Sequence, residues 1–247
     1  MKAREEGSVE RLSKSQIDRL GNRLKSGDLE EANVRLLDTY RRSFGGPYEV
    51  VVRSIRGQLA LDPTGRPAKS TSAIVEKLQR ESIRLSQIQD IAGCRIVVAD
   101  VVRQNDAVRR LLQTFPDSRI IDRRATPSHG YRAVHFIPTI DGVGIEVQVR
   151  TSLQHLWSEF SEKLSDVIDP SVKYGGGSDE IRAVLEKTSE FVGRIERQEY
   201  QLFAAIERVS ELSPGEVETM QAEHNRIKSE LGSLLRDLAA QYTGRSI

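Results

Sequence analysis

The segment 142–151 reads Gly-Val-Gly-Ile-Glu-Val-Gln-Val-Arg-Thr and carries the side chains best suited to chemistry. Its strict alternation predicts a strand with apolar residues on one face and Glu146, Gln148 and Arg150 on the other. A carboxylate, an amide and a guanidinium at two-residue spacing are suited to holding a metal-bound polyphosphate and a hydroxyl. A polar sheet face with an ion pair along the row is the structural alternative.

A second carboxylate, Asp90, lies just before an apolar, β-branched run over 94–99 that predicts a buried strand. Open sheets often place ligand chemistry at such strand ends. With Glu146 it would complete a two-carboxylate Mg²⁺ site, because magnesium commonly uses one or two carboxylates plus substrate phosphates. A turn capped by Asp90, with Gly93 only permitting close packing, explains the segment equally well.

Cations cluster in the segment 62–77, where Arg66, Lys69 and Lys77 surround a predicted helix start. Backbone N–H groups and the helix dipole favour anions at such a position, so a cationic side chain there is suited to cradling a phosphate. A solvated charged loop is the competing interpretation.

The segment 131–140 is expected to form a further strand, joined through a hairpin turn at Asp141-Gly142 to the strand described above. Its alternation places Tyr131, Ala133 and His135 on one face. The Tyr131 ring can stack on a base, although an aromatic packed within the sheet and a hydrogen-bonded structural histidine fit the same residues. Together, the cations, the two carboxylates and the aromatic ring indicate phosphoryl-type transfer on a nucleotide. The sequence contains neither a Walker loop nor a kinase-type glycine loop.

The elements that would position these side chains form an α+β arrangement, in which a mixed β-sheet is flanked by helices and followed by two long helices. Helices are predicted over Ser13–Lys25, Leu29–Phe44 (capped by Asp28), onward to about Ala60, Ser72–Ser82 (capped by Ser72), Val101–Phe115 (capped by Asp100), Thr151–Asp169, Glu180–Leu212 and Pro214–Tyr242. Turns are expected at Gly45–Pro47 and 62–67, a strand at Arg119–Asp122, and a glycine-rich hinge or functional loop at 170–179.

The 247 residues carry a formal net charge of only +1, which gives no strong overall field for nucleic acid or membrane. The single Cys94 excludes a disulfide framework and suits a reducing cytoplasm. No apolar run in the sequence approaches the roughly 20 residues that span a bilayer, and the charged N-terminus is unlike a secretory signal. We therefore expect a cytoplasmic protein without membrane contact.

Four segments resemble, in order and with similar spacing, the motifs of the synthetase domain of the RelA/SpoT family, which makes the alarmones ppGpp and pppGpp. They are Lys69…Ile74…Lys77, Asp90-Ile-Ala-Gly-Cys-Arg95, Gly130-Tyr-Arg-Ala-Val-His135, and Glu146-Val-Gln-Val-Arg-Thr151 followed by Trp157. The resemblance covers about 45–170, which would form a nucleotidyltransferase-like core between an N-terminal helical segment (1–44) and a C-terminal helical extension (171–247). With no His-Asp hydrolase motif and no room for a long regulatory C-terminus, the chain resembles a small, stand-alone synthetase.

The resemblance implies Mg²⁺-dependent attack of the 3′-hydroxyl of GDP or GTP on the β-phosphorus of ATP, so that pyrophosphate is transferred and AMP is released. Asp90 and Glu146 would bind the Mg²⁺, and Glu146 would also activate the hydroxyl. ATP would bind through Arg66, Lys69, Lys77 and Arg95. The acceptor would be held by Tyr131, which would stack on the guanine, and by His135, Gln148 and Arg150.

Three departures from the family pattern bear on nucleotide binding. Pro67 stands where an arginine two residues before Lys69 is usual, and a one-residue loop shift would be needed to bring Arg66 there. Ala73 replaces a frequent serine, and His129 replaces a frequent asparagine before Gly-Tyr. The acceptor is therefore left open among guanine nucleotides, adenine nucleotides and tRNA.

Two other functions fit the same residues. A toxic relative would transfer pyrophosphate to the 3′ end of tRNA or make an adenosine alarmone, and the tRNA version needs a basic surface. The sequence offers for that surface Arg119, Arg123, Arg124 and Arg132. An inactive oligomeric binding module is the third hypothesis, and retention of both carboxylates argues against it.

The C-terminal helices, about 180–243, are expected to mediate a homo-oligomer, as in many small synthetases of the family, although intramolecular packing fits their apolar stripe nearly as well. The stripe comprises Ile181, Val184, Leu185, Phe191, Ile195, Leu202 and Ile206. The segment 173–177, Lys-Tyr-Gly-Gly-Gly, is expected either to close over nucleotide or to be a plain flexible linker.

Overall fold

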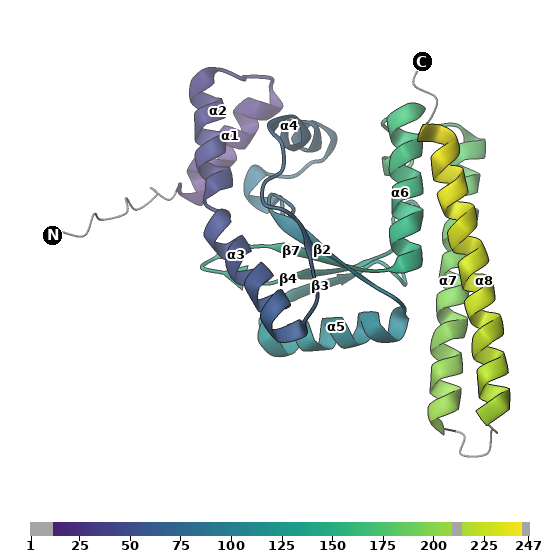
Figure 1. The fold of residues 1–247 in the computed structure, drawn as a ribbon. Helices are drawn as coiled ribbons and strands as arrows, with labels where there is room; N and C mark the ends of the chain where they lie inside the picture. Colours follow the sequence, from purple (N-terminus) through teal and green to yellow (C-terminus); the bar gives the residue numbers. More distant parts are fainter. Residues whose placement is uncertain (1–11, 209–213, 244–247) are drawn as a thin grey trace. The chain divides into compact units, whose positions relative to one another are not determined.

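The computed structural model describes residues 12–208 and 214–243, which form helices and a sheet and confirm the α+β class (Figure 1). Within these ranges, five strands form one sheet in the order β1-β2-β7-β4-β3, and two short strands, β5 and β6, form a hairpin. The chain divides into two compact units. The first comprises the residues up to Arg95 with 114–119 and 136–147, and the second comprises 96–113, 120–135 and the residues from Gln148 onward.

The first unit begins with a group of helices. They are α1 (Lys14–Lys25), α2 (Glu31–Arg42), α3 (Gly45–Ser54), which continues as a π-helical turn over Ile55–Leu59, and α4 (Thr71–Arg80). The helix α1 begins where expected, because Ser13 and Gln16 form a capping box with hydrogen bonds of 2.8 and 3.3 Å. It contacts both α2 and α4, so these three helices form one layer.

Three helix starts differ from the sequence expectation. The N-cap of α2 is Glu30, and Asp28 instead accepts a hydrogen bond of 3.3 Å from the Glu30 backbone N–H. The N-cap of α4 is Ser70 rather than Ser72, because the Ser70 hydroxyl accepts a backbone N–H of the first turn at 3.3 Å. The expected turn at Gly45–Pro47 is the first turn of α3, where a proline fits because its missing N–H would have no helical partner.

The basic segment expected to be a loop contains a short strand, β1 (Thr64–Arg66), which pairs antiparallel with β2 (Gly93–Val98). In this register Arg66 lies opposite Gly93. The expectation of a loop is wrong, because the backbone of 64–66 pairs with β2 despite the turn-like composition of 62–67. Gly65 is required in this strand, since a Cβ there would lie 1.5 Å from the hydroxyl oxygen of Tyr48.

The hairpin at Asp141-Gly142 is confirmed, with φ of 51° and 77° at the two turn residues. It joins β5 (Thr139–Ile140) to β6 (Val143–Gly144), which pair antiparallel. After it, β7 (Glu146–Thr151) forms as a strand as predicted, but its polar face is also largely buried, since only Gln148 is partly exposed. The apolar side is completely buried, since Ile145, Val147 and Val149 are each 0% exposed.

The strand before the hairpin is shorter than expected, because β4 spans only Val134–Ile137. Tyr131 precedes it in a tight turn closed by two backbone hydrogen bonds with Ser128, of 2.9 and 3.3 Å. Gly130, with φ of 85°, makes this turn possible. The expectation that Tyr131 and His135 share a regular strand face is therefore wrong at Tyr131.

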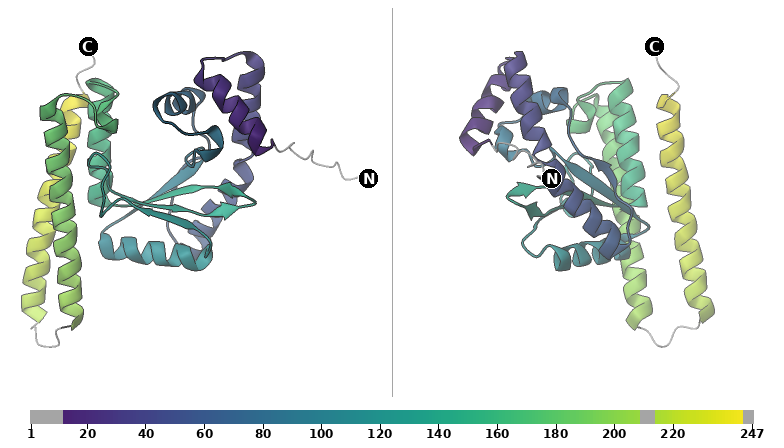
Figure 2. Two further views of the ribbon diagram at one scale, coloured as in Figure 1. Left: turned by 180° about the vertical axis from the view of Figure 1, so that it is seen from behind. Right: turned by 60° about the vertical axis from the view of Figure 1, so that its left-hand side comes forward.

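The second unit contains most of β3 (Arg119–Asp122), which forms as expected, and, within the described ranges, four α-helices. They are α5 (Val101–Thr114), α6 (Ser152–Val167), α7 (Asp179–Arg208) and α8 (Pro214–Thr243). Asp100 caps α5 as predicted, because its carboxylate accepts the Arg103 N–H at 2.7 Å. In Figures 1 and 2, α6, α7 and α8 run side by side, around a core that includes Trp157, Phe160 and Leu235. Leu212, the expected end of the first long helix, lies outside the described residues.

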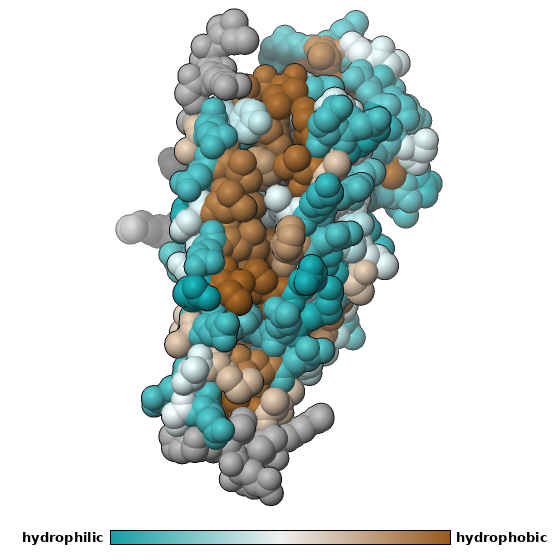
Figure 3. Space-filling model, turned by 90° about the vertical axis from the view of Figure 1, so that its right-hand side faces the viewer, coloured by the Kyte–Doolittle hydropathy of each residue, from teal (hydrophilic) through white to brown (hydrophobic). Residues whose placement is uncertain are grey.

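The apolar stripe predicted on α7 divides between two faces. Leu185 and Ile195 are buried, with 3% and 6% of their surface exposed. Val184 and Phe191 are 43% and 52% exposed, so the expectation of one continuous stripe is wrong for these two residues. Figure 3 views the molecule from the side of α7 and α8 and shows an apolar strip there. Across the described ranges, no helix has the length and apolar character needed to cross a membrane.

Candidate functional site

The first cluster of site residues lies in the first unit, where Asp90 stands between two lysines. Asp90 Oδ2 lies 2.6 Å from Lys69 Nζ, and Oδ1 lies 3.0 Å from Lys77 Nζ. All three side chains are at least three-quarters buried, since the most exposed of them, Lys77, is 22% exposed. The Lys69 backbone N–H donates to the Ile91 carbonyl at 2.7 Å, and Lys77 is positioned by α4. The structure therefore brings together two ammonium groups and one carboxylate.

The two lysines determine the charge of Asp90. Burial raises the pKa of the Asp90 carboxyl, but the positive charges of Lys77 and Lys69 outweigh burial and lower the pKa to about 2. The group is therefore ionised at neutral pH, which a ligand for a hard cation must be. Its carboxylate binds ammonium groups rather than capping a turn.

Glu146, at the start of β7, is held close to β2 by Gly93. A Cβ on Gly93 would lie 2.5 Å from the Glu146 carbonyl oxygen and 3.3 Å from the Glu146 Cβ. The Glu146 N–H also donates to the Ala92 carbonyl at 3.2 Å, and Glu146 is 9% exposed. The structural interpretation of Gly93 as a close-packing residue is thus confirmed. This packing places Glu146 beside the segment that follows Asp90.

The second cluster lies in the second unit and centres on Tyr131. Its hydroxyl lies 3.0 Å from His135 Nε2, and either group can donate, depending on the histidine tautomer. Arg150 Nη2 donates to the same hydroxyl at 3.1 Å and to Gln148 Oε1 at 2.8 Å. The Arg150 guanidinium also lies over the Tyr131 ring, with its carbon 5.1 Å from the ring centroid. Four predicted acceptor-binding residues are therefore in mutual contact.

Arg150 is the most unusual member of this cluster, because it is only 3% exposed. Its Nε and Nη1 atoms are buried and have no hydrogen-bond partner within the described part of the chain. Buried guanidinium nitrogens without hydrogen-bond partners are unfavourable, so this arrangement favours an anionic ligand. The sequence gives the residue type at this position but not its burial.

Two glycines support the turn that carries Tyr131. A Cβ on Gly130 would lie 2.6 Å from Trp157 Cζ2, so the tryptophan closes tightly on this turn. The Trp157 indole N–H donates to the Leu185 carbonyl at 3.1 Å, which fixes the ring. A Cβ on Gly175 would lie 2.2 Å from His129 Nδ1. Sequence reasoning missed this contact, because no local pattern relates the glycine segment to the residue before Gly130.

The glycine segment is more regular than expected. It includes a 3₁₀ turn over Val172–Tyr174, and hydrogen bonds of 2.9 Å join Ser171 O to the N–H groups of Tyr174 and Gly176. A plain flexible linker does not describe this structure. Closure over nucleotide stays a prediction.

Two predicted ATP-binding residues lie on the paired strands of the first unit. Arg95 is in β2 and is half-buried, and Arg66 is in β1 with a side chain that falls outside the described structure. In the described portion, no group of three or more His, Cys, Asp or Glu side chains is placed to hold a metal ion. Asp90 and Glu146 fit Mg²⁺ only as a partial ligand set, which is the usual arrangement where substrate phosphates complete the coordination.

Residues 65–165 match the family described as "Region found in RelA / SpoT proteins". Uncharacterized proteins of Mycobacterium bovis and Mycobacterium tuberculosis are each 36% identical over 133 residues, which are 51% of this chain and 48% of each relative. The chain thus spans about half the length of these relatives. A probable chloroplastic GTP diphosphokinase of Oryza sativa is 33% identical over 97 residues, which are 37% of this chain and 14% of that protein.

Among solved structures, the small alarmone synthetase 1 of Bacillus subtilis shares the fold. One structure of it covers 68% of this chain and 98% of its own, at 24% identity and a TM-score of 0.51. A second, bound to its product pppGpp, covers 73% of this chain and 100% of its own, at 23% identity and a TM-score of 0.53. The family match and the four sequence motifs agree in likening residues 65–165 of this chain to the RelA/SpoT region.

Proposed function

We propose that the protein is a pyrophosphotransferase that moves pyrophosphate from ATP to the 3′-hydroxyl of GDP or GTP, making (p)ppGpp and AMP. The observation that carries this proposal is the buried Arg150 guanidinium. Two of its nitrogens have no hydrogen-bond partner among the described residues, and it lies beside the Tyr131 ring. A ligand that is both anionic and aromatic satisfies both groups, as a nucleotide does. The RelA/SpoT region supports a guanine nucleotide as acceptor.

On the donor side, Lys69 and Lys77 would exchange their partner. Without nucleotide they bind Asp90, at 2.6 and 3.0 Å. With the ATP triphosphate in place, its oxygens would take over the two ammonium groups, and Arg66 and Arg95 would add further cations. Every charge stays compensated through this exchange, and Asp90 becomes available as a ligand. Positioning and charge neutralisation of this kind supply most of the rate in phosphoryl-type transfer.

On the acceptor side, Tyr131 would stack on the guanine. One region of its ring is already occupied by the Arg150 guanidinium, 5.1 Å from the centroid, so the base would use the other face. His135 would contact the acceptor's phosphates or ribose, and Gln148 would keep Arg150 oriented through their 2.8 Å hydrogen bond. Glu146 would accept the proton of the 3′-hydroxyl, because a carboxylate within hydrogen-bond reach can serve as a general base.

The residues present fit a Mg²⁺ ion held by Asp90 and Glu146 together with substrate phosphates. When bound, Mg²⁺ would polarise the transferred group and stabilise the leaving oxygen. The part played by the chain is to keep both carboxylates ionised, and the low pKa of Asp90, about 2, meets that requirement for Asp90.

The tRNA alternative needs exposed arginines, and two of the four that suggested it are engaged internally. Arg124 binds Asp122 with bonds of 2.6 to 3.1 Å and also donates to Asn105 at 2.7 Å. Arg132 donates to Ser189 at 3.0 and 3.1 Å. Arg124 is thus engaged fully and Arg132 in part, which reduces the expected basic surface, so we favour a free nucleotide as acceptor.

We also propose a homo-oligomer formed through α7 and α8. Large apolar side chains are exposed on both helices, and on α8 they recur at seven-residue spacing, as in a coiled-coil seam. The α8 residues are Met220, Ile227 and Leu234, which are 45%, 40% and 50% exposed. The strip visible in Figure 3 fits a second copy of the chain better than it fits solvent.

The enzyme proposal is tested by incubating purified protein with Mg²⁺ and ATP labelled in the γ-phosphate. The acceptors are GDP, GTP, no added acceptor, or bulk tRNA, and products are separated by thin-layer chromatography. Label should move to GDP or GTP, and Glu146→Gln should abolish the transfer. The matched control Glu186→Gln, at an exposed position on α7, should leave it unchanged. Label found only on tRNA, or on none of the acceptors, would contradict the proposal.

A further inference from the structure

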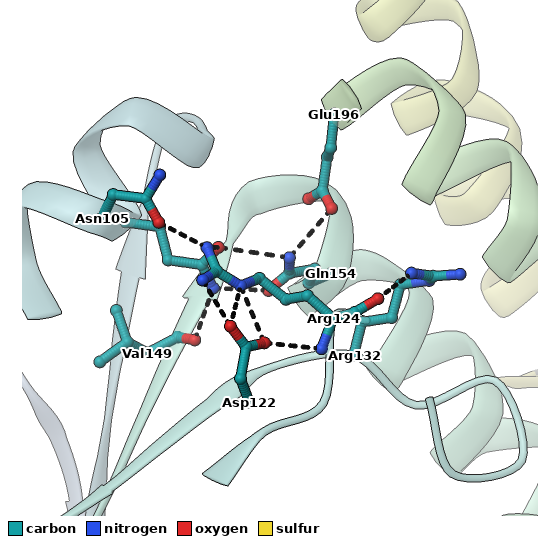
Figure 4. Close-up of polar contacts among 8 residues, drawn as sticks. Asn105, Asp122, Arg124, Arg132, Val149, Gln154 and Glu196 are labelled. Carbon is teal, nitrogen blue, oxygen red and sulfur yellow. Dashed lines mark hydrogen bonds and ion pairs between the residues drawn. The ribbon is translucent and has the colours of Figure 1, made fainter. Parts of the chain in front are cut away.

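A cavity of about 460 Å³ lies in the second unit, and its lining includes none of the four residues of the Tyr131 cluster. Its lining includes Asn105, Arg124, Arg132, Glu196, Arg197 and Tyr200. The volume is within the range of about 300–1,000 Å³ that is usual for small-molecule sites. Its residues come from α5, from the segment after β3, and from α7. Figure 4 shows the polar contacts around it.

One wall of this cavity is electrically balanced and rigid. The Arg124 guanidinium forms several hydrogen bonds with the Asp122 carboxylate and donates to Asn105 at 2.7 Å and to Gln104 at 3.2 Å (Figure 4). Because its donors are already bonded and its charge is paired, Arg124 is a structural part of the wall. It offers little to a ligand.

A second wall carries two arginines, Arg132 and Arg197, that lack, among the described residues, an ion pair like that of Arg124 with Asp122. Arg132 Nε donates to Ser189, and Nη1 donates to the Arg124 carbonyl at 2.6 Å. These bonds hold Arg132 in place and leave its Nη2 without a partner among the described residues. Arg197, on α7, is exposed and forms no hydrogen bond or ion pair in the portion of the chain that is described. Besides the paired Arg124, two guanidinium groups that are not fully paired thus line this cavity.

Glu196 does not compensate this charge fully. Its carboxylate accepts a hydrogen bond from the Thr151 hydroxyl. It accepts another from Gln154 Nε2 at 3.0 Å (Figure 4). Burial raises the pKa of the Glu196 carboxyl, so the group ionises less readily than an exposed glutamate. Burial also lowers the pKa of Arg132; Glu196 opposes that shift, and the neighbouring Arg197 adds to it. An anion between the two arginines would relieve their repulsion.

The rim of the cavity carries an aromatic ring. Tyr200 is 53% exposed, and it lies on α7 one turn beyond Glu196. We propose that this cavity binds a nucleoside phosphate, with the phosphoryl group between Arg132 and Arg197 and the base on Tyr200. Paired guanidinium groups suit phosphate oxygens, and every base offers a face for stacking. The assignment uses only residues of the second unit and does not depend on the proposed function.

Isothermal titration calorimetry on the purified chain tests this site, with AMP and inorganic pyrophosphate as probes. Arg197→Gln should weaken binding of both probes about tenfold, because a charge-assisted hydrogen bond is lost. Tyr200→Ala should weaken binding of AMP about tenfold and leave pyrophosphate unaffected, because only AMP carries a base. The matched control Arg194→Gln removes an exposed arginine from the same helix that does not line the cavity, and should change neither affinity.

Two further variants distinguish binding in the cavity from binding at the candidate active site. Lys69→Ala and Tyr131→Ala alter that site and should leave the cavity's affinity for both probes intact. Unchanged affinity in Arg197→Gln, or equal losses in Arg194→Gln, would overturn the proposal. Loss of binding in Lys69→Ala or Tyr131→Ala, with Arg197→Gln unaffected, would assign the titration to the active site and also overturn it. Failure of the pyrophosphate-transfer assay would bear on neither outcome.

Discussion

Replacing Asp90 by asparagine tests the central electrostatic contact of the site. The substitution keeps the shape of the side chain, removes its charge, and leaves Lys69 and Lys77 facing each other with side chains 12% and 22% exposed. The ordinary carboxyl pKa of 3.8 and the folded value of about 2 differ by roughly 1.8 units. At about 1.4 kcal/mol per unit, ionised Asp90 contributes ~2 kcal/mol to the free energy of unfolding.

The sign of this contribution sets its pH dependence. Because the folded pKa is lowered, the stabilisation is complete above about pH 4 and is lost as the pH falls towards 2. We therefore expect Asp90→Asn to be less stable than the parent by ~2 kcal/mol at pH 6, with the difference shrinking steadily below pH 4. Urea unfolding followed by circular dichroism, between pH 6 and pH 2.5, measures both chains under the same conditions.

A matched control separates this effect from general acid unfolding. Asp237→Asn changes a carboxyl on α8 that the structure places in no ion pair among the described residues, and its stability should parallel the parent at every pH. A difference between Asp90→Asn and the parent that stays constant from pH 6 to pH 2.5 would refute the reasoning. It would show that the lysines do not lower the pKa of Asp90.

Three further predictions follow from the geometry. Gly93→Ala should displace the start of β7, lowering the free energy of unfolding by about 1–3 kcal/mol in chemical denaturation and reducing pyrophosphate transfer; wild-type values in both assays would contradict the close contact with Glu146. Burial raises the pKa of the Cys94 thiol to about 12, with Glu146 adding to the shift and Arg56 opposing it, so a thiol reagent at pH 8 should label the chain only after denaturation. Leu234→Glu should reduce the mass measured by light scattering to that of a single 27.7 kDa chain, whereas a wild-type protein already of that mass would exclude the oligomer.

Local patterns in the sequence were enough to predict several of the elements that carry the site. The strand β7 and the turn at Asp141-Gly142 are confirmed, because a strand period of two and a pair of positive-φ residues are encoded within a few positions. Asp100 was identified as a cap for the same reason. The choice of Ser70 over Ser72 was not predictable, since both serines are suitable caps and the backbone path decides between them.

The remaining features depend on contacts between distant segments. The strand β1 forms because β2 satisfies its backbone, although Gly65 and the flanking Pro63 and Pro67 predict a loop. Periodicity along α7 predicts an apolar stripe but not which of its residues are buried, so Phe191 belongs to the predicted stripe although it is 52% exposed. The burial of Arg150 likewise results from packing that no stretch of β7 reveals.

The buried Arg150 also makes the thermal stability of the protein depend on occupancy of its site. A side chain 3% exposed, with nitrogens that lack partners in the described structure, makes the ligand-free state less stable than its packing alone would allow. Any anion that fills this position should raise the melting temperature in proportion to the logarithm of its concentration. Arg150→Met, by contrast, should melt at a higher temperature than the unliganded parent and be indifferent to nucleotide. Selection for a working site would then oppose selection for a stable chain at this one position.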